Sequence, residues 1–115
     1  TGTATVKTKS TDAIAIGNGA EVVVQEGVKT DSGEESIAVG KNAKAYGKGS
    51  VIIGSGAHTE RADMTLSNGD DAVAIGHDTF AKARSVATGS HASAGIVNSV
   101  AIGERAMVTT IRRWY

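Results

Sequence analysis

The stretch that decides the fold is Ser99-Val100-Ala101-Ile102-Gly103, a phrase that recurs along the chain with small changes. The glycines that end its copies lie at positions 17, 40, 54, 76, 89 and 103, with spacings of 23, 14, 22, 13 and 14 residues. The underlying period is therefore 14 residues, and two of the intervals hold an insert. A repeat this short cannot bury its own apolar face, so it predicts a solenoid in which each unit stacks on its neighbours.

Two columns of the repeat hold a β-branched residue in every copy. They stand one and three places before the glycine, a spacing that puts both side chains on one face of a strand. Branching at Cβ restricts χ1 and favours extended backbone. Each copy of the phrase is therefore predicted to be a short strand that ends at a glycine turn.

Small side chains, mostly alanine and serine, fill the columns two and four places before the glycine and three and five places after it. Each coil is thus predicted to contain two short strands and two turns, with Gly47, Gly49 and Gly95 suited to a positive φ in the second turn. The narrow space between the strands fits the small columns, whereas two valines or isoleucines per coil would overfill it. In the alternative that stays open, the β-branched columns pack inside and the alanine face meets solvent.

An outward stripe of valine and isoleucine predicts association between identical chains. With about 4.8 Å between stacked strands, the coils give a stripe roughly 29 Å long. Burial of each such side chain contributes ~1.5–3 kcal/mol before entropy is subtracted. The simplest way to bury the stripe is to pack it against the same stripe of identical subunits arranged around a cyclic symmetry axis. The residues expected in this interface are Ile14, Ile16, Ile37, Val39, Val51, Ile53, Val73, Ile75, Val86, Val100 and Ile102.

Composition narrows the class of protein. The chain has 115 residues, 12 basic and 12 acidic side chains and no net charge, so nothing marks it as a nucleic-acid binder. It has no cysteine and hence no disulfide. No apolar run approaches about 18 residues and no signal peptide is present, so the chain as given is expected neither to span a membrane nor to carry an export address.

Two polar inserts, within 23–34 and 60–70, interrupt the repeat at the same place in the coil. Both carry glycine and Asp or Asn turn signals, so both are expected to protrude from the same end of the roll. A tolerated surface loop is the simpler interpretation, and a ligand-binding loop is the alternative. The insert residues expected to contact a ligand are Gln25, Lys29, Asp31, Glu34, Glu60, Arg61, Asp63, Asn68 and Asp70.

The phrase, repeated at this spacing and followed by an Ala-x-Ala motif, resembles the head repeats of trimeric autotransporter adhesins, the YadA-like family. Residues 98–103 match that family's NSVAIG phrase letter for letter, and residues 36–45 and 72–81 fit its looser consensus. The resemblance implies a left-handed parallel β-roll, a homotrimer, and display on the outer membrane at the cell surface of a Gram-negative bacterium. The neck, stalk and C-terminal membrane anchor of such proteins have no counterpart in the chain, so an excised head is expected.

The head is expected to span residues 1–108, with residues 109–115 as a cap or the start of a connector. The family implies attachment to host matrix, for example collagen, fibronectin or laminin, or to a host cell receptor, without a cofactor. A structural spacer that displays another binding domain is the alternative function. Because NSVAIG-type repeats of the family are linked to collagen binding, the candidate matrix-binding residues are Asn98, Ser99, Val100, Ala101, Ile102 and Gly103.

The sequence offers no catalytic motif. The segment 54–58 lacks the Gly-x-Ser-x-Gly pattern, and no column supplies the paired carboxylates of a glycosidase, so the chain is not expected to be an enzyme. His58, His77 and His91 fall in different columns, so stacking is not expected to align them in a metal site.

Two weaker binding hypotheses rest on charged residues. An acidic loop at Asp63, Asn68, Asp70 and Asp71 has oxygen ligands for Ca²⁺ but departs from the EF-hand spacing. A solvated outer face is predicted from five basic residues, with contact to acidic glycans as the alternative: Lys41, Lys44, Lys48, Lys82 and Arg84.

Overall fold

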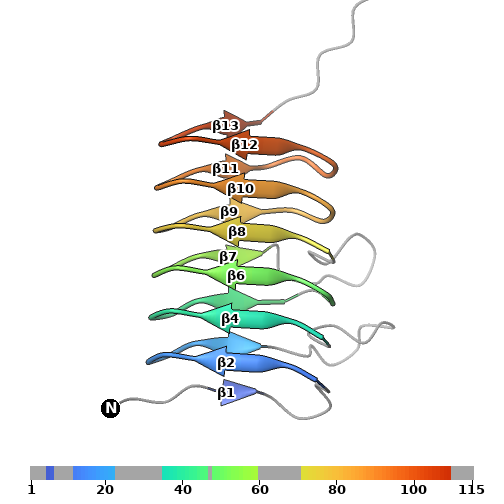
Figure 1. Cartoon of the computed structure of the whole chain (residues 1–115). Coiled ribbons are helices and arrows are strands. Elements are labelled where there is room, and N and C mark those ends of the chain that lie inside the picture. The colour runs from blue at the N-terminus through green and yellow to red at the C-terminus, as the bar shows by residue number, and fades with distance from the viewer. Residues whose placement is uncertain (1–4, 7–11, 23–34, 47, 60–70, 110–115) are drawn as a thin grey trace, which may run out of the picture.

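A computed structural model describes residues 5–6, 12–22, 35–46, 48–59 and 71–109. These residues form an all-β roll whose short strands fall alternately into two parallel sheets (Figure 1). As the chain rises in Figure 1 it runs leftward along the front strands and rightward along the rear strands, so the roll is left-handed. The predicted fold class, a parallel β-roll, is confirmed. Among the described residues, no helical segment has the length and apolarity needed to span a bilayer.

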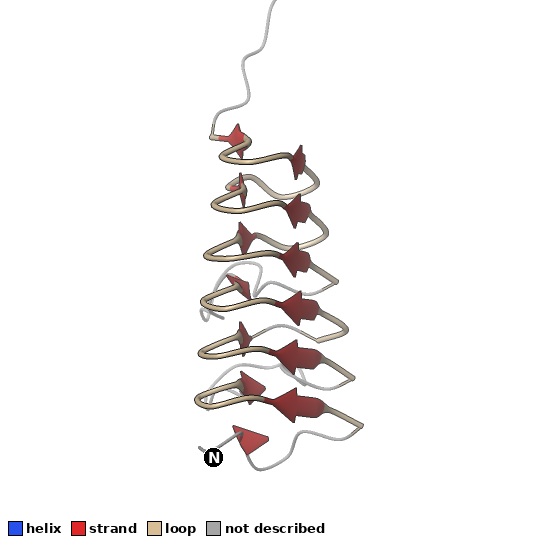
Figure 2. Ribbon diagram, turned by 60° about the vertical axis from the view of Figure 1, so that its left-hand side comes forward, coloured by secondary structure: helices blue, strands red, loops and turns tan. Residues whose placement is uncertain are grey.

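Each full coil contributes one three-residue strand to the even sheet and one two-residue strand to the odd sheet (Figure 2). The even sheet contains β2 (Ile14–Ile16), β4 (Ile37–Val39), β6 (Val51–Ile53), β8 (Val73–Ile75), β10 (Val86–Thr88) and β12 (Val100–Ile102). The odd sheet contains β1 (Thr5–Val6), β3 (Glu21–Val22), β5 (Lys44–Ala45), β7 (His58–Thr59), β9 (Phe80–Ala81), β11 (Ser93–Ala94) and β13 (Met107–Val108).

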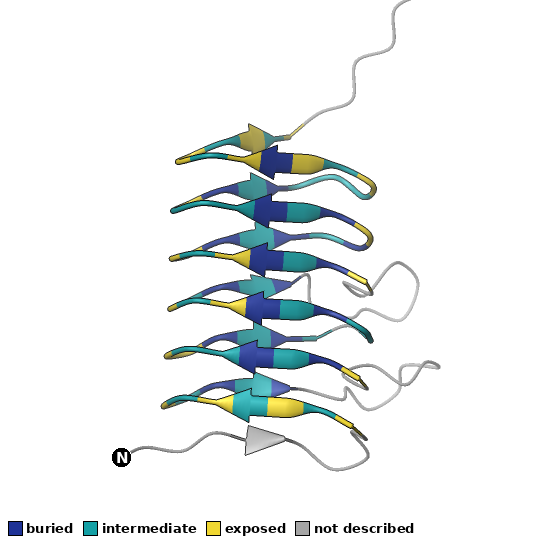
Figure 3. Cartoon of the chain, in the orientation of Figure 1, coloured by how far each residue is buried: buried dark blue, intermediate teal, exposed yellow. Residues whose placement is uncertain are grey.

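The small columns line the interior, as the sequence predicts (Figure 3). Ala38, Ala74 and Ala87 are fully buried, and so is Ala45 on the odd sheet. Ile52 is the largest fully buried side chain among the described residues, and the register places it between Ala38 and Ala74. A branched side chain therefore fits in the interior where its neighbours in the stack are alanines. The alternative orientation, with the β-branched columns inside, is wrong.

Serine recurs four places before the glycine because its hydroxyl joins successive coils. The backbone N–H of Ser50 donates to Ser36 Oγ at 3.1 Å. In the same way the N–H of Ser99 donates to Ser85 Oγ at 3.0 Å, and that hydroxyl donates to the carbonyl oxygen of Ile96 at 2.8 Å. A buried hydroxyl without a partner is costly, so these bonds allow a polar side chain in a narrow core.

Two features require glycine at the end of the phrase. The backbone there has a positive φ, and the backbone of the next coil leaves no room for a Cβ. The φ of this glycine lies between 123° and 131° in all six copies, a region that residues with a side chain rarely adopt. A Cβ added at Gly54 would stand 2.3 Å from the carbonyl oxygen of Gly76 in the next coil. The glycine columns thus let successive turns stack in direct backbone contact.

Two further columns adopt a positive φ, one in each turn. Their non-glycine members have φ between 53° and 62°, the left-handed region that asparagine, aspartate and glycine tolerate best. Gly49 has the predicted positive φ, but Gly95 does not, and Gly47 lies outside the described residues. The second-turn column, five places before the glycine, is Asp12, Glu35, Gly49, Asp71, Arg84 and Asn98, and the first-turn column, two places after it, is Gly19, Asn42, Gly56, Asp78, His91 and Arg105.

Replacing Arg105 by asparagine is expected to raise the free energy of unfolding by about 0.5 kcal/mol, because asparagine tolerates the left-handed region better than a long side chain. Arg105 is exposed and has φ 57°. Its exposed neighbour Glu104 is not in the positive-φ set, so Glu104→Asn is the matched control and should bring no gain. Urea denaturation at one chain concentration measures both, and an equal gain in the two variants would contradict the backbone explanation.

Candidate interaction surface

The outer face of the even sheet is an aliphatic stripe, which we define as the Val and Ile residues one and three places before each phrase-ending glycine. Parallel in-register pairing places these residues directly over one another, as in Ile14 over Ile37. At the top of the roll Val100 and Ile102 are 61% and 67% exposed, while Ile53 and Ile75 in the middle are still 40% and 36% exposed. All residues predicted for the interface lie on this outer face, and none of them is buried within the chain.

The outer face of the odd sheet is mixed in character. Lys44 Nζ lies 3.8 Å from Glu21 Oε2, and the ring of His58 packs against Phe80 with 5.0 Å between centroids. Further along the sheet, Met107 is 65% exposed. Charged, polar and aromatic groups on this face are compatible with water or with a ligand. Of the two outer faces, the aliphatic stripe is the one whose apolar surface favours contact with another protein chain over contact with water.

The prediction that five basic residues share one outer face is wrong. Lys41 lies in the first turn, Lys44 on the odd sheet and Arg84 in the second turn. Arg84 Nε donates to Asn98 Oδ1 at 3.0 Å, which ties this guanidinium to the next coil. Because each coil contains two strands and two turns, residues that are close in the sequence lie on different sides of the roll.

Only some residues of the candidate matrix-binding phrase at 98–103 are exposed on the surface of the roll. Ala101 is buried and Ser99 points inward, where its hydroxyl donates to the carbonyl oxygen of Ile96. Val100 and Ile102 belong to the aliphatic stripe, and Asn98 is exposed in the second turn with φ 62°. Asn98 therefore supplies the positive φ of the turn, whereas Val100 and Ile102 face outward from the even sheet.

The predicted ligand-contacting residues of the inserts lie outside the described residues. Their described flanks are equivalent: Val22 and Thr59 end odd-sheet strands, whereas Glu35 and Asp71 occupy the second turn with φ 55°. Both inserts therefore leave and rejoin the coil at the same turn, as predicted. The residues concerned are Gln25, Lys29, Asp31, Glu34, Glu60, Arg61, Asp63, Asn68 and Asp70.

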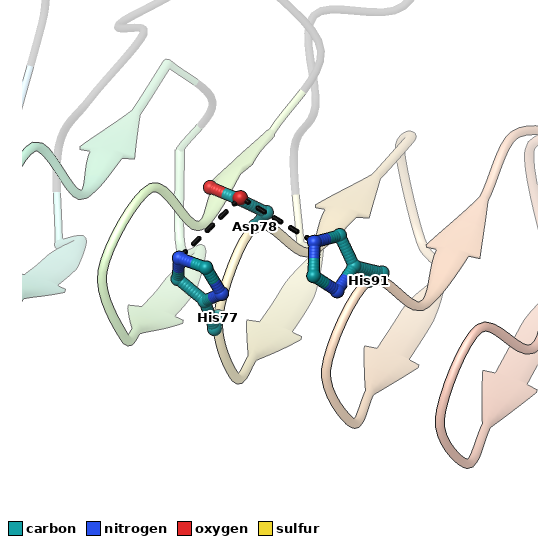
Figure 4. A group of neighbouring side chains, drawn as sticks. All are labelled: His77, Asp78 and His91. Carbon is teal, nitrogen blue, oxygen red and sulfur yellow. Dashed lines mark ion pairs between the residues drawn. The ribbon is translucent and has the colours of Figure 1, made fainter.

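His77 and His91 lie side by side, which corrects the prediction that stacking would not align the histidines (Figure 4). Their ring centroids are 5.3 Å apart, and each Nε2 faces Asp78 Oδ2, at 3.4 Å from His77 and 3.6 Å from His91. At the turn, side chains one and two places after the glycine meet across successive coils. His58 lies apart, on the odd sheet, with Nδ1 3.1 Å from the carbonyl oxygen of Gly56.

A model of the YadA head domain repeat matches two segments of the chain, residues 32–57 and 67–92. Each segment includes two phrase-ending glycines, Gly40 and Gly54 in the first and Gly76 and Gly89 in the second. These segments are YadA head repeats. The coils that end at Gly17 and Gly103 keep the same glycine φ and the same strand pairing, and so they extend the YadA head roll at both ends. No curated protein sequence matches the chain.

YadA head repeats are found in the surface-exposed heads of trimeric autotransporter adhesins, a family of adhesins rather than of enzymes. The two matched segments are accordingly of the type that builds adhesin heads. In a roll built from such repeats, the features available for contact with another molecule are the two outer faces, the turns and the inserts.

Proposed function

We propose that the chain is the head of a homotrimeric adhesin that attaches a bacterium to host extracellular matrix or to a host cell receptor. The observation that carries the proposal is the aliphatic stripe on a roll of YadA head repeats. In this proposal the head extends over residues 1–108, and residues 109–115 cap the roll or begin a connector.

The contrast between the two outer faces supports an oligomer, and the YadA-like family supplies the number of three chains. Three rolls with parallel axes bring their aliphatic stripes together around one three-fold axis, which removes all three stripes from water. The stripe repeats with the coil, so the contact between chains is the same in each layer. Ile53 and Ile75, 40% and 36% exposed in the single chain, would become buried in this arrangement.

Ligand binding uses the surface that the trimer leaves free. With the even sheets covered, the odd sheets face outward and present Glu21, Lys44, His58 and Phe80. The two inserts and the exposed Asn98 lie at the second turn, at one edge of this face. Three copies per head and many heads per cell convert modest single contacts into firm attachment by avidity.

A solid-phase assay on collagen, fibronectin, laminin and host cells tests this function. The purified trimer is expected to bind at least one of these surfaces with saturation. Absence of binding to all of them would contradict the adhesion proposal and favour the alternative of a structural spacer.

Insert-replacement variants test where the ligand binds. Putting the three residues Tyr46-Gly47-Lys48 in place of residues 23–34, or in place of residues 60–70, restores the 14-residue period without altering the coil. Binding is expected to fall by about tenfold or more in at least one variant, because loops at a solenoid edge carry its specificity. Circular dichroism and light scattering provide the control, since the fold and the mass per particle should stay those of the parent. Full binding by both variants would place the ligand on the odd-sheet face instead.

A further inference from the structure

We propose that His77, Asp78 and His91 form a binding site for a divalent transition metal ion, with Zn²⁺ as the representative ligand. The site lies at the first turn, where two successive coils meet (Figure 4). It is built within one chain, so it depends neither on the trimer nor on the adhesive function proposed above.

The distances between the candidate ligand atoms suit a tetrahedral ion. With Zn–N and Zn–O bonds of about 2.0 Å, two ligands of a tetrahedron stand about 3.3 Å apart. Asp78 Oδ2 lies 3.4 Å from His77 Nε2 and 3.6 Å from His91 Nε2. The three ligand atoms all lie within 4.8 Å of one another. Two edges of the tetrahedron are therefore already formed, and the third closes by rotation of exposed imidazoles.

The backbone holds the three residues in place. Asp78 and His91 occupy the same column of successive coils, two places after the glycine, with φ 53° and 61°. The N–H of His91 donates to the carbonyl oxygen of His77 at 2.8 Å, so the next coil is fixed directly against His77. The ligands thus come from a stacked turn with little backbone freedom, which lowers the entropy cost of assembling a site.

A neighbouring hydroxyl orients one of the ligands. Ser90 Oγ lies 2.8 Å from His91 Nδ1. In the tautomer that carries the proton on Nδ1, the imidazole donates to Ser90 Oγ and leaves the lone pair of Nε2 directed at Asp78. Metal-binding histidines commonly donate their second ring nitrogen in this way.

The ligand chemistry selects the kind of ion. Two imidazoles and one carboxylate suit Zn²⁺, Ni²⁺ or Cu²⁺, whereas Ca²⁺ and Mg²⁺ prefer a shell of oxygens. His77, Asp78 and His91 are 57%, 51% and 48% exposed, so the fourth position is open to water or to a donor from another molecule. The site is thus suited to reversible binding or to a metal bridge between the head and a ligand.

Isothermal titration of the tag-free chain with ZnCl₂, and separately with CaCl₂, tests the site. One Zn²⁺ per chain is expected to bind with saturation, and Ca²⁺ is not. His77→Ala, Asp78→Asn and His91→Asn should each weaken Zn²⁺ binding by about tenfold or more, since each removes one of three ligands. Asparagine is chosen at positions 78 and 91 because it tolerates their positive φ.

His58→Ala is the matched control, because it removes a histidine that lies outside the cluster, and it should leave the titration unchanged. Circular dichroism of each variant shows that the roll is retained. Absence of saturable Zn²⁺ binding would overturn the proposal, as would binding that survives in the His77→Ala and His91→Asn variants or that is lost equally in His58→Ala. A Co²⁺-loaded chain with the strong visible absorption of a tetrahedral site would support the geometry, and octahedral absorption would contradict it.

Discussion

Alanine in place of Gly54 is expected to lower the free energy of unfolding by about 4 kcal/mol, from backbone strain and a steric clash together. The new Cβ would stand 2.3 Å from the carbonyl oxygen and 2.7 Å from the carbonyl carbon of Gly76. Those atoms belong to the backbone of the next coil, so they cannot turn aside as the end of a side chain can. Chemical denaturation at a fixed chain concentration measures the loss.

Gly103→Ala is the matched control for this substitution. Gly103 has φ 124°, close to the 131° of Gly54, but the nearest atom a new Cβ would meet is Ala106 Cβ at 4.0 Å. Its cost is therefore backbone strain alone, about 1–3 kcal/mol. If the two variants lose the same stability, direct contact between the glycine turns is not what excludes a side chain at Gly54.

The double variant Val73→Asp with Ile75→Asp is expected to convert the proposed trimer to monomers. Both residues belong to β8, and both face outward from the even sheet, where Ile75 is 36% exposed. Around a three-fold axis the substitutions would gather six carboxylates in an apolar interface. Burial of unpaired like charges costs several kcal/mol per group, more than the stripe contributes in that layer. Light scattering of the variant should give a mass near the 11.6 kDa of one chain.

The control for the double variant places the same charge on the other outer face. Ser93→Asp with Met107→Asp alters two paired residues of the odd sheet, which the proposed trimer leaves exposed. This variant should keep the mass of the parent. Circular dichroism should show the roll in both variants, since none of the four side chains lies in the interior. Dissociation of the control would indicate that the odd sheet, rather than the even sheet, forms the interface.

Much of the fold is predictable from the sequence because the repeat imposes one solution on every coil. Ala38 and Ala74 are inside and Val100 and Ile102 are outside for reasons of volume that can be read from the columns. The positive φ of Glu35 and Arg84 is harder to foresee, since neither residue type favours the left-handed region. The need for a positive φ at this turn is indicated only by the column as a whole, which has aspartate, glycine and asparagine at equivalent places.

The side-chain cluster at the first turn is not predicted by reading single columns. His77 stands one place after its glycine and His91 two places after its own, so they look unrelated in the sequence. They meet because stacking displaces each coil by one strand spacing, about 4.8 Å, which a side chain of histidine length spans. A comparison of neighbouring columns in adjacent coils would have found the pair.

In the proposed assembly, the aliphatic stripe of the even sheet is the contact between three identical chains. Multi-angle light scattering of the purified wild-type chain tests it most directly. A single species of about 35 kDa is expected, three times the 11.6 kDa mass of one chain. A monodisperse species of 11.6 kDa across micromolar concentrations would contradict this assembly, because the stripe would then be stable in water without a partner chain.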